Sequence, residues 1–317
     1  MLDLSAAFDT VNHNILLTRL NEELGICGLA LEWFRSYLAK RGQRVSIDGS
    51  LAERFSLECG VPQGSCLGPL LFLLYASKLF RVVEDQFPHA HCYADDTQIN
   101  LSFKPISNIS QEDAVRAMER CIVKIRRWLI HDRLLLIDDK TEFIIIGTRQ
   151  KKLQAMNIKE GSSVIKPSSQ VKNLGSWLDP NLNMRHHIRN VCKAGFFYLH
   201  NIRCIKTYLS RDSLLTIVHA FITSRLEYCN ALIYGLPKEQ IVKLRRVQNA
   251  AARLIKDIGK YSHFTPAFYE LHWLPVLARI HFKILLLAFK AIHGLAPGYI
   301  SNLLVIKLKS SYNLRSS

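Results

Sequence analysis

The feature that most constrains the fold of this chain is a change in hydrophobic periodicity near residue 184. From Met184 onward, apolar residues recur at helical spacing over 184–206, 211–227, 238–258 and 276–293. The last of these segments is apolar nearly all round, so we expect it to be buried. Before residue 184, helical segments at 11–24, 30–38, 70–83 and 110–129 alternate with short strand-like segments. The pattern predicts an α+β fold whose C-terminal part is entirely helical.

Several short segments in the N-terminal part have the composition of strands. Residues 43–59 predict a hairpin, and residues 143–147 predict a buried strand. A second hairpin is expected to pair residues 164–165 with 171–178 around Pro167. The segment 1–4 also has strand character, but a strand this short is expected to be weakly anchored and to fray.

Charge is distributed unevenly along the 317 residues. Residues 1–150 hold 17 Lys and Arg against 19 Asp and Glu, whereas residues 151–317 hold 25 against 7. A strongly basic half indicates a polyanion-binding arm, and a basic surface that only maintains solubility is an equal alternative.

The eight cysteines show no C-x-x-C pair, which favours reduced thiols in an intracellular protein. The longest apolar run, 69–76, is too short to cross a membrane, so no membrane partner is expected.

Two adjacent carboxylates, Asp95 and Asp96, lie between the apolar run 92–94 and a second strand-like segment. This pattern predicts a hairpin with the acids at its turn. A solvated turn is the ordinary explanation of such a pair. However, a third acid, Asp3, also ends an apolar segment. Three carboxylates on neighbouring strand ends would repel one another unless a hard cation such as Mg²⁺ neutralised them.

A glycine-rich loop precedes the helical segment 70–83. Gly60, Gly64 and Gly68 would let the backbone approach a ligand closely, and Gln63 places an amide just before the helix. The alternative is a Gly/Pro linker that leads into a core helix.

Five motifs in order resemble the reverse transcriptases of LINE-type non-LTR retrotransposons. They are Asp-Leu-Ser-Ala-Ala-Phe-Asp (3–9), Gly-Val-Pro-Gln-Gly-Ser (60–65), Tyr-Ala-Asp-Asp (93–96), Lys-Thr-Glu (140–142) and Asn-Leu-Gly (173–175). The resemblance implies a right-hand polymerase, with an antiparallel palm over residues 1–180 and a basic helical thumb and C-terminal region over 181–317. Because Met1 stands two residues before Asp3, we expect a palm-and-thumb fragment that lacks the fingers.

The resemblance also assigns roles to single residues. Asp3, Asp95 and Asp96 would form the metal-binding acidic cluster for Mg²⁺, with Mn²⁺ as the alternative ion, and the reaction would be two-metal nucleotidyl transfer. Lys140 matches the lysine that protonates the leaving pyrophosphate, and an ordinary exposed lysine is its alternative.

The remaining assigned residues bind substrates. Phe8 would select deoxynucleotides, although a core aromatic residue is a competing explanation. Gln63, Gly64 and Tyr93 would complete the nucleotide and template pocket. The primer grip would be formed by three successive residues, Asn173, Leu174 and Gly175.

The implied partners are an RNA template, a DNA primer and dNTPs, and the implied location is the nucleus; the oligomeric state stays open. The chain departs from the family at Asp132, where Asn is frequent. The leading hypothesis is an RNA-directed DNA polymerase fragment with impaired activity on its own. The alternative is a non-catalytic nucleic-acid-binding remnant of a retroelement, and the third is a decayed insertion without function.

Overall fold

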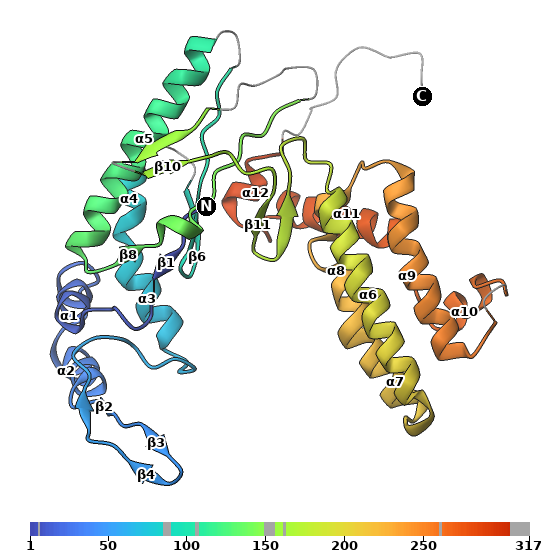
Figure 1. Ribbon diagram of the computed structural model, residues 1–317, viewed down its shortest axis with the longest axis horizontal. Coiled ribbons are helices and arrows are strands. Elements are labelled where there is room, and N and C mark those ends of the chain that lie inside the picture. The colour runs from blue at the N-terminus through green and yellow to red at the C-terminus, as the bar shows by residue number, and fades with distance from the viewer. Residues whose placement is uncertain are drawn as a thin grey trace. The chain divides into compact units, whose positions relative to one another are not determined.

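The computed structural model describes residues 1–5, 7–84, 90–104, 108–148, 156–160, 163–259 and 262–304. The chain divides into two compact units. Unit 1 comprises Met1–Gly175 with Asp179–Asn181, and unit 2 comprises Ser176–Leu178 with Leu182–Ser317. Unit 1 combines helices with two-stranded antiparallel pairs, and the described part of unit 2 is helical apart from one short strand (Figure 1). The predicted α+β fold is confirmed at this level.

The helices of unit 1 begin close to where the sequence predicts them. Asn12 caps the first one, because its Oδ1 accepts a hydrogen bond from the Ile15 N–H at 3.1 Å. The predicted helix 70–83 is divided at Ser77, whose hydroxyl donates to the Leu74 carbonyl and competes with the backbone ladder. The helices are α1 (His13–Glu22), α2 (Gly28–Leu38), α3 (Gly68–Ala76), α4 (Lys78–Glu84) and α5 (Asn108–His131).

The strands are short and pair two by two. The hairpin expected within residues 43–59 is confirmed as two nested pairs that share one turn. The antiparallel pairs are β1 (Leu4–Ser5) with β8 (Leu135–Leu136), β2 (Gly42–Gln43) with β5 (Phe55–Ser56), β3 (Ser46–Ile47) with β4 (Ser50–Leu51), β6 (Ala90–Tyr93) with β7 (Asp96–Ile99), and β9 (Ile158–Glu160) with β10 (Ser163–Ile165). A further pair joins β11 (Val171–Asn173) to β12 (Ser176–Leu178).

Two strand predictions are wrong. Val164 and Ile165 pair with β9 rather than with 171–178, because the local partner is reached through a tighter connection. Residues 143–147 form no strand: Phe143 makes one isolated bridge to Pro167, and the run is only partly buried. A short apolar run does not by itself distinguish a paired strand from an extended segment.

The core of unit 1 is built where α1, α3 and α5 meet. Leu16, Leu71, Phe72 and Ile125 are fully buried there. A charged pair lies inside the same core: Arg19 of α1 donates to the Asp132 carboxylate and to the backbone carbonyl of Tyr75. Leu2 and Leu4 belong to this core too, so the N-terminal segment is held by packing rather than frayed as expected.

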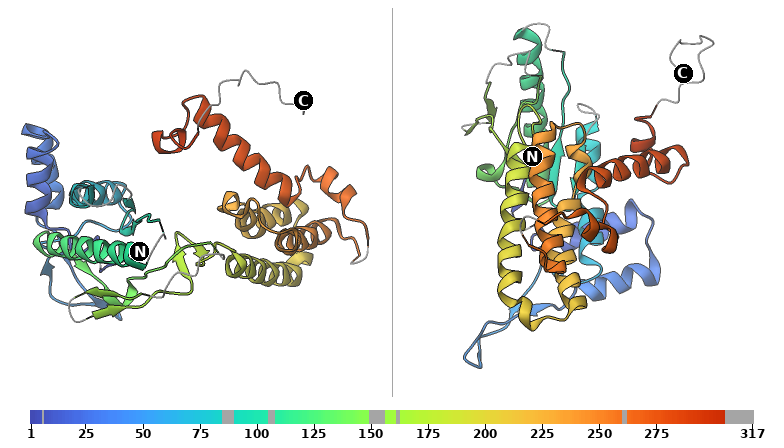
Figure 2. Two further views of the ribbon diagram at one scale, coloured as in Figure 1. Left: turned by 90° about the horizontal axis from the view of Figure 1, so that it is seen from above. Right: turned by 90° about the vertical axis from the view of Figure 1, so that its right-hand side faces the viewer.

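Unit 2 is a packed set of helices, seen partly end-on in Figure 2. Its predicted segments are confirmed, except that 211–227 is interrupted by a π-helical turn at His219–Thr223. Pro237, Pro275 and Pro297 stand immediately before three of the helices, where a missing N–H costs nothing. The α-helices are α6 (Arg185–Ile205), α7 (Arg211–Val218), α8 (Ser224–Glu227), α9 (Lys238–Lys256), α10 (Thr265–Glu270), α11 (Val276–Ile292) and α12 (Gly298–Ser301).

The expectation that the last long helix is buried is wrong. In α11 only Val276, Ile280 and Ala291 are buried, whereas Leu285 is 68% exposed and Phe289 is 54% exposed. When a helix is apolar nearly all round, its sequence does not indicate which face is buried. In α11 only one narrow face packs against the rest of unit 2. Among the described helices, none is long and apolar enough to cross a bilayer.

Candidate active site

The two adjacent acids lie at the tip of the β6–β7 hairpin, as the sequence predicts. Tyr93 pairs with Asp96 across the hairpin, which leaves Ala94 and Asp95 as its two turn residues. Ala94 has a φ of +53°, the left-handed conformation that such a tight turn demands. Asp95 is half-buried, and Asp96 is the first, exposed residue of β7.

Asp3 is brought next to this hairpin by backbone pairing. The N–H of Leu2 donates to the Thr97 carbonyl at 2.8 Å, and the Thr97 N–H donates back at 3.2 Å. On its other side the segment pairs through β1 with β8, and the Ile137 N–H donates to the Asp3 carbonyl at 3.0 Å. The first residues of the chain therefore run between β7 and β8, and Asp3 and Asp96 lie on neighbouring backbone segments.

The electrostatics of the three acids show that they interact. Although Asp96 is an exposed residue, partial desolvation of its carboxyl group raises the pKa of Asp96 above its ordinary value, and the charges of Asp95 and Asp3 raise that pKa further. Lys140, which ends a single 3₁₀ turn at Asp138–Lys140, extends its ammonium to 3.2 Å from Asp3 Oδ2. Four of the predicted residues are therefore neighbours: the charges of Asp3 and Asp95 act on Asp96, and the Lys140 ammonium lies beside Asp3.

The carboxylates match a hard divalent cation in chemistry. Oxygen atoms such as those of aspartate are the ligands that Mg²⁺ prefers, and a carboxylate that is close to other negative charges is stabilised by a bound cation. Within the described residues, no three acidic, His or Cys side chains lie close enough together to form a complete metal-binding group. The donor set fits Mg²⁺, and the Lys140 ammonium stands beside Asp3.

The glycine-rich loop is fastened to the first motif through a residue that the sequence analysis missed. Gln63 Nε2 donates to both carboxylate oxygens of Asp9, at 3.0 and 3.1 Å. Gly60, at a φ of +87°, lies so close to Asp9 that an added Cβ would come within 3.0 Å of its carbonyl oxygen. Gly64 has a φ of +82° with open space around it. Asp9 is the last residue of the motif that begins with Asp3. Its place in that motif is the sequence feature that could have indicated a role for Asp9 at the site.

Phe8 and Tyr93 lie in different environments. The Phe8 ring packs on Phe72 of α3, with ring centroids 5.1 Å apart, at the edge of the unit 1 core. Tyr93 is 70% exposed at the end of β6. Tyr93 thus presents a free aromatic face beside the acids, whereas Phe8 has a packing partner in the core.

The predicted primer-grip residues form the tight turn between β11 and β12. Leu174 and Gly175 both have positive φ, at +43° and +82°. The Asn173 side-chain amide donates to Gln98 Oε1 at 2.7 Å, which ties this hairpin to β7. The strand that begins with Asp96 therefore also holds Asn173.

Comparison with known proteins identifies the group to which this arrangement belongs. Residues 1–178 match the family model of reverse transcriptase (RNA-dependent DNA polymerase). The chain is 24% identical over 282 residues to a probable RNA-directed DNA polymerase from transposon BS of Drosophila melanogaster, an alignment that covers 86% of this chain and 30% of the relative.

Two further relatives come from the same fly. The probable RNA-directed DNA polymerase from transposon X-element is 24% identical over 260 residues, covering 80% of this chain and 28% of the relative. The RNA-directed DNA polymerase from mobile element jockey is 27% identical over 198 residues, covering 61% and 21%. The chain thus spans less than a third of the length of these relatives. It belongs to the reverse transcriptase family, among the non-LTR retrotransposon enzymes that its motifs resemble.

Proposed function

We propose that this chain carries the palm, residues 1–180, and the thumb, residues 181–317, of an RNA-directed DNA polymerase. Its substrates would be an RNA template, a DNA primer and dNTPs, and it would work in the nucleus, where a retroelement finds its target DNA. The observation that carries the proposal is geometric: the bridge from Leu2 to Thr97 lays Asp3 beside the β6–β7 hairpin, and the Lys140 ammonium lies 3.2 Å from Asp3 Oδ2. Repelling acids beside a lysine suit a site that receives cations and phosphates.

Each residue has a task in nucleotidyl transfer. Asp3, Asp95 and Asp96 would hold Mg²⁺, or Mn²⁺ in its place. Bound there, the ions would activate the primer 3′-hydroxyl and stabilise the negative charge on the leaving pyrophosphate. Lys140 would donate a proton to the pyrophosphate oxygen, and its present contact with Asp3 keeps its ammonium at the site.

The substrate contacts complete the proposal. Gln63 and Gly64 would line the nucleotide and template pocket, and the bond from Gln63 to Asp9 supports this by fixing the loop to the first motif. Tyr93 would contact the nucleotide from the hairpin, and Phe8 would limit space near the ribose. The turn Asn173–Leu174–Gly175 would hold the primer end.

Primer extension on poly(rA)/oligo(dT) with dTTP and Mg²⁺ tests the proposal. Asp95→Asn should abolish extension, whereas Asp48→Asn should leave it intact, because Asp48 lies at the turn of the separate β3–β4 hairpin. Extension that survives Asp95→Asn would overturn the assignment of the acids. A wild-type chain that binds the primer–template without extending it would instead favour the nucleic-acid-binding alternative, which the basic unit 2 supports.

A further inference from the structure

Helix α11 exposes an apolar stripe that has no role in the proposed chemistry. The α11 stripe consists of four residues that are each between 54% and 68% exposed: Phe282, Leu285, Phe289 and Ile292. The buried residues of the same helix, Val276, Ile280 and Ala291, lie on the opposite face. α11 therefore has two apolar faces, of which one packs inside unit 2 and the other is exposed.

The spacing of the α11 stripe is that of a coiled-coil seam. Its members follow one another at intervals of three, four and three residues along the helix. Phe282 and Phe289 therefore occupy the a positions of a heptad, and Leu285 and Ile292 occupy the d positions. A helix that packs on a globular core normally needs a wider apolar face than these two positions supply. The stripe therefore suits a single partner helix that lies along it.

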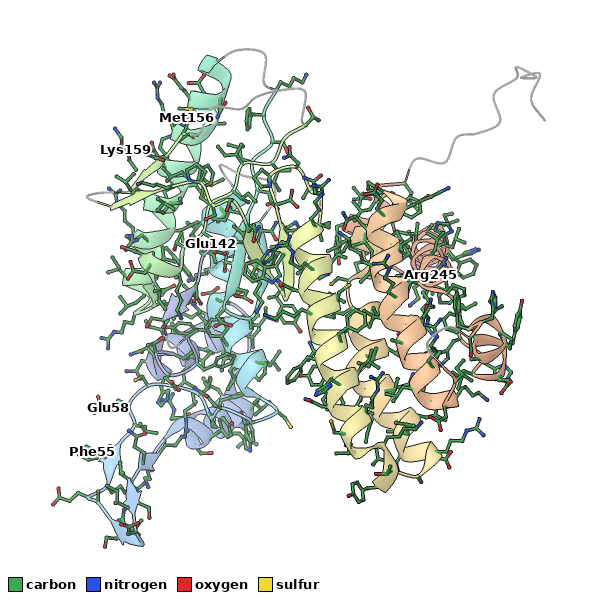
Figure 3. The ribbon with its side chains drawn as sticks, turned by 45° about the vertical axis from the view of Figure 1, so that its right-hand side comes forward. Phe55, Glu58, Glu142, Met156, Lys159 and Arg245 are labelled. Carbon is green, nitrogen blue, oxygen red and sulfur yellow. The ribbon has the colours of Figure 1, made fainter. Side chains whose placement is uncertain are left out.

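The stripe is accessible because α11 extends past its neighbours. In both views of Figure 2, the C-terminal half of α11 projects beyond the other long helices of unit 2. The exposed face of α9, by contrast, is mainly charged: Arg245, labelled in Figure 3, is exposed and lies 5.7 Å from the centroid of the Phe264 ring. A contiguous exposed face that carries Phe, Leu and Ile instead of charged residues indicates an interaction surface.

The residues beside the stripe indicate which kind of helix pairs with it. Positions e and g of a heptad normally hold the charges that select an oppositely charged partner. On α11 these positions carry no acid, lysine or arginine, because they are His281, Leu286, Ala288 and His293. Lys283 and Lys290 stand at b positions, which point away from the seam. An oppositely charged partner therefore gains nothing beside the seam, whereas a second copy of α11 meets no charge repulsion there.

The exposed area of the stripe is sufficient for a pair of helices. With about 200 Å² for a side chain of this size, the four residues expose roughly 450 Å² in one copy and roughly 900 Å² in two. The half-buried Leu286 and Ala288 beside them add to this area. The total then reaches the roughly 1,000 Å² that a specific interface needs.

We propose that the chain forms a homodimer in which the α11 stripes of two copies pack antiparallel about a two-fold axis. In this orientation the two helix dipoles oppose each other. Phe282 of one copy faces Ile292 of the other, and Leu285 faces Phe289, so every layer joins one ring to one aliphatic side chain. A parallel pair would instead set ring against ring. The proposal does not rest on polymerase activity, because α11 lies outside the acidic site.

Sedimentation equilibrium of the full chain at about 50 μM tests the proposal, since this concentration exceeds the micromolar dissociation constants of weak specific interfaces. The wild type should have twice the chain mass of 36.3 kDa. Leu285→Glu should weaken the dimer about 100-fold or more, because each copy would bury an unpaired carboxylate in the seam.

Leu277→Glu is the matched control for this variant. It makes the same change on the same helix, at a residue that is 50% exposed but lies outside the heptad seam. It should dimerise within about twofold of the wild type. Thermal melts should show that both variants are folded, since both side chains are exposed in the single chain.

Cysteine cross-linking tests the orientation of the two helices. Phe282→Cys/Ile292→Cys should give a covalent dimer under mild oxidation, because the two positions face each other across the antiparallel seam. Within one helix they lie about 15 Å apart, too far for a disulfide. Either single variant should cross-link no more than the wild type, which controls for the eight native cysteines.

Three results would overturn the proposal. The first is a wild-type chain that remains at 36.3 kDa, and the second is an equal loss of dimer in Leu285→Glu and Leu277→Glu. The third is strong cross-linking of either single cysteine variant, which would show a parallel pair. A monomeric wild type that sediments with phosphatidylserine vesicles would assign the stripe to a membrane surface instead of a second copy.

Discussion

The buried pair Arg19–Asp132 yields the sharpest stability prediction. The Arg19 side chain is 4% exposed and that of Asp132 is 2% exposed, so each charge depends on the other. Arg19 also lies over the ring of Tyr75, 4.9 Å from its centroid, and the Tyr75 hydroxyl donates to the Asp132 backbone carbonyl. The pair therefore joins α1, α3 and the end of α5.

The expected loss in the free energy of unfolding depends on which of the two charges remains buried without its partner. Arg19→Met leaves the Asp132 carboxylate buried, with His131 Nδ1 at 3.0 Å as its remaining side-chain partner, and should cost about 3–5 kcal/mol. Asp132→Asn keeps an oxygen that can accept from Arg19, so it should cost about 1.5–3 kcal/mol. The double variant removes both charges and should be more stable than Arg19→Met alone.

Urea unfolding, followed by hydrogen exchange of peptides from α1, α3 and α5, measures these differences within unit 1. Local measurement matters because the two units need not unfold together. Arg116→Met is the control: its pair with Glu112 on α5 is exposed and should contribute about 0–0.5 kcal/mol. Additive losses in the double variant would refute the reasoning, because they would show that the two charges do not depend on each other.

Three further outcomes are expected. Gly195→Ala should destabilise unit 2 by about 1–3 kcal/mol in urea, since its Cβ would meet Val247 Cγ1 at 2.7 Å, and adding Val247→Ala should recover much of this loss. Because the folded pKa of Asp96 is raised, ionisation of this carboxyl destabilises the fold at pH values above the ordinary aspartate pKa of about 3.9. Asp96→Asn should therefore raise the melting temperature at pH 7 and not at pH 3. Burial lowers the pKa of His187, so the wild type should lose stability as the pH falls below about 6.5, and His187→Gln should lose less in the same melts while exposed His200→Gln follows the wild type.

Local patterns predicted most of the helices and the hairpin of the acids. Helical spacing identified α1, α5, α6 and α9 to within about two residues, because an amphipathic stripe is a property of the segment itself. The Asp95 turn was equally visible, since two strand-like runs flank it. Pairing between distant segments could not be predicted, because the register of short strands depends on partner strands that the local sequence does not identify.

Polar partners inside the fold were also beyond the sequence. Asp132 differs from the residue that is frequent at this position in the family, and the sequence alone suggests a chance substitution there. The structure gives the carboxylate a buried partner, Arg19, 113 positions away in sequence. The bond from Gln63 to Asp9 was missed for the same reason, since each residue alone has an ordinary loop explanation. Likewise, the composition of α11 gave its hydrophobicity but not its packing face.

The candidate site depends on backbone pairing as much as on its acids. Asp3 reaches Asp96 only because the chain beside it pairs with two partners: Leu2 with Thr97 of β7, and β1 with β8. Thr97 is 2% exposed, so the bridge that sets the register lies in the interior. A one-residue slip in this segment would turn the Asp3 side chain toward the opposite face. The buried register at Leu2 and Thr97, rather than the carboxylates themselves, therefore decides whether the three charges converge.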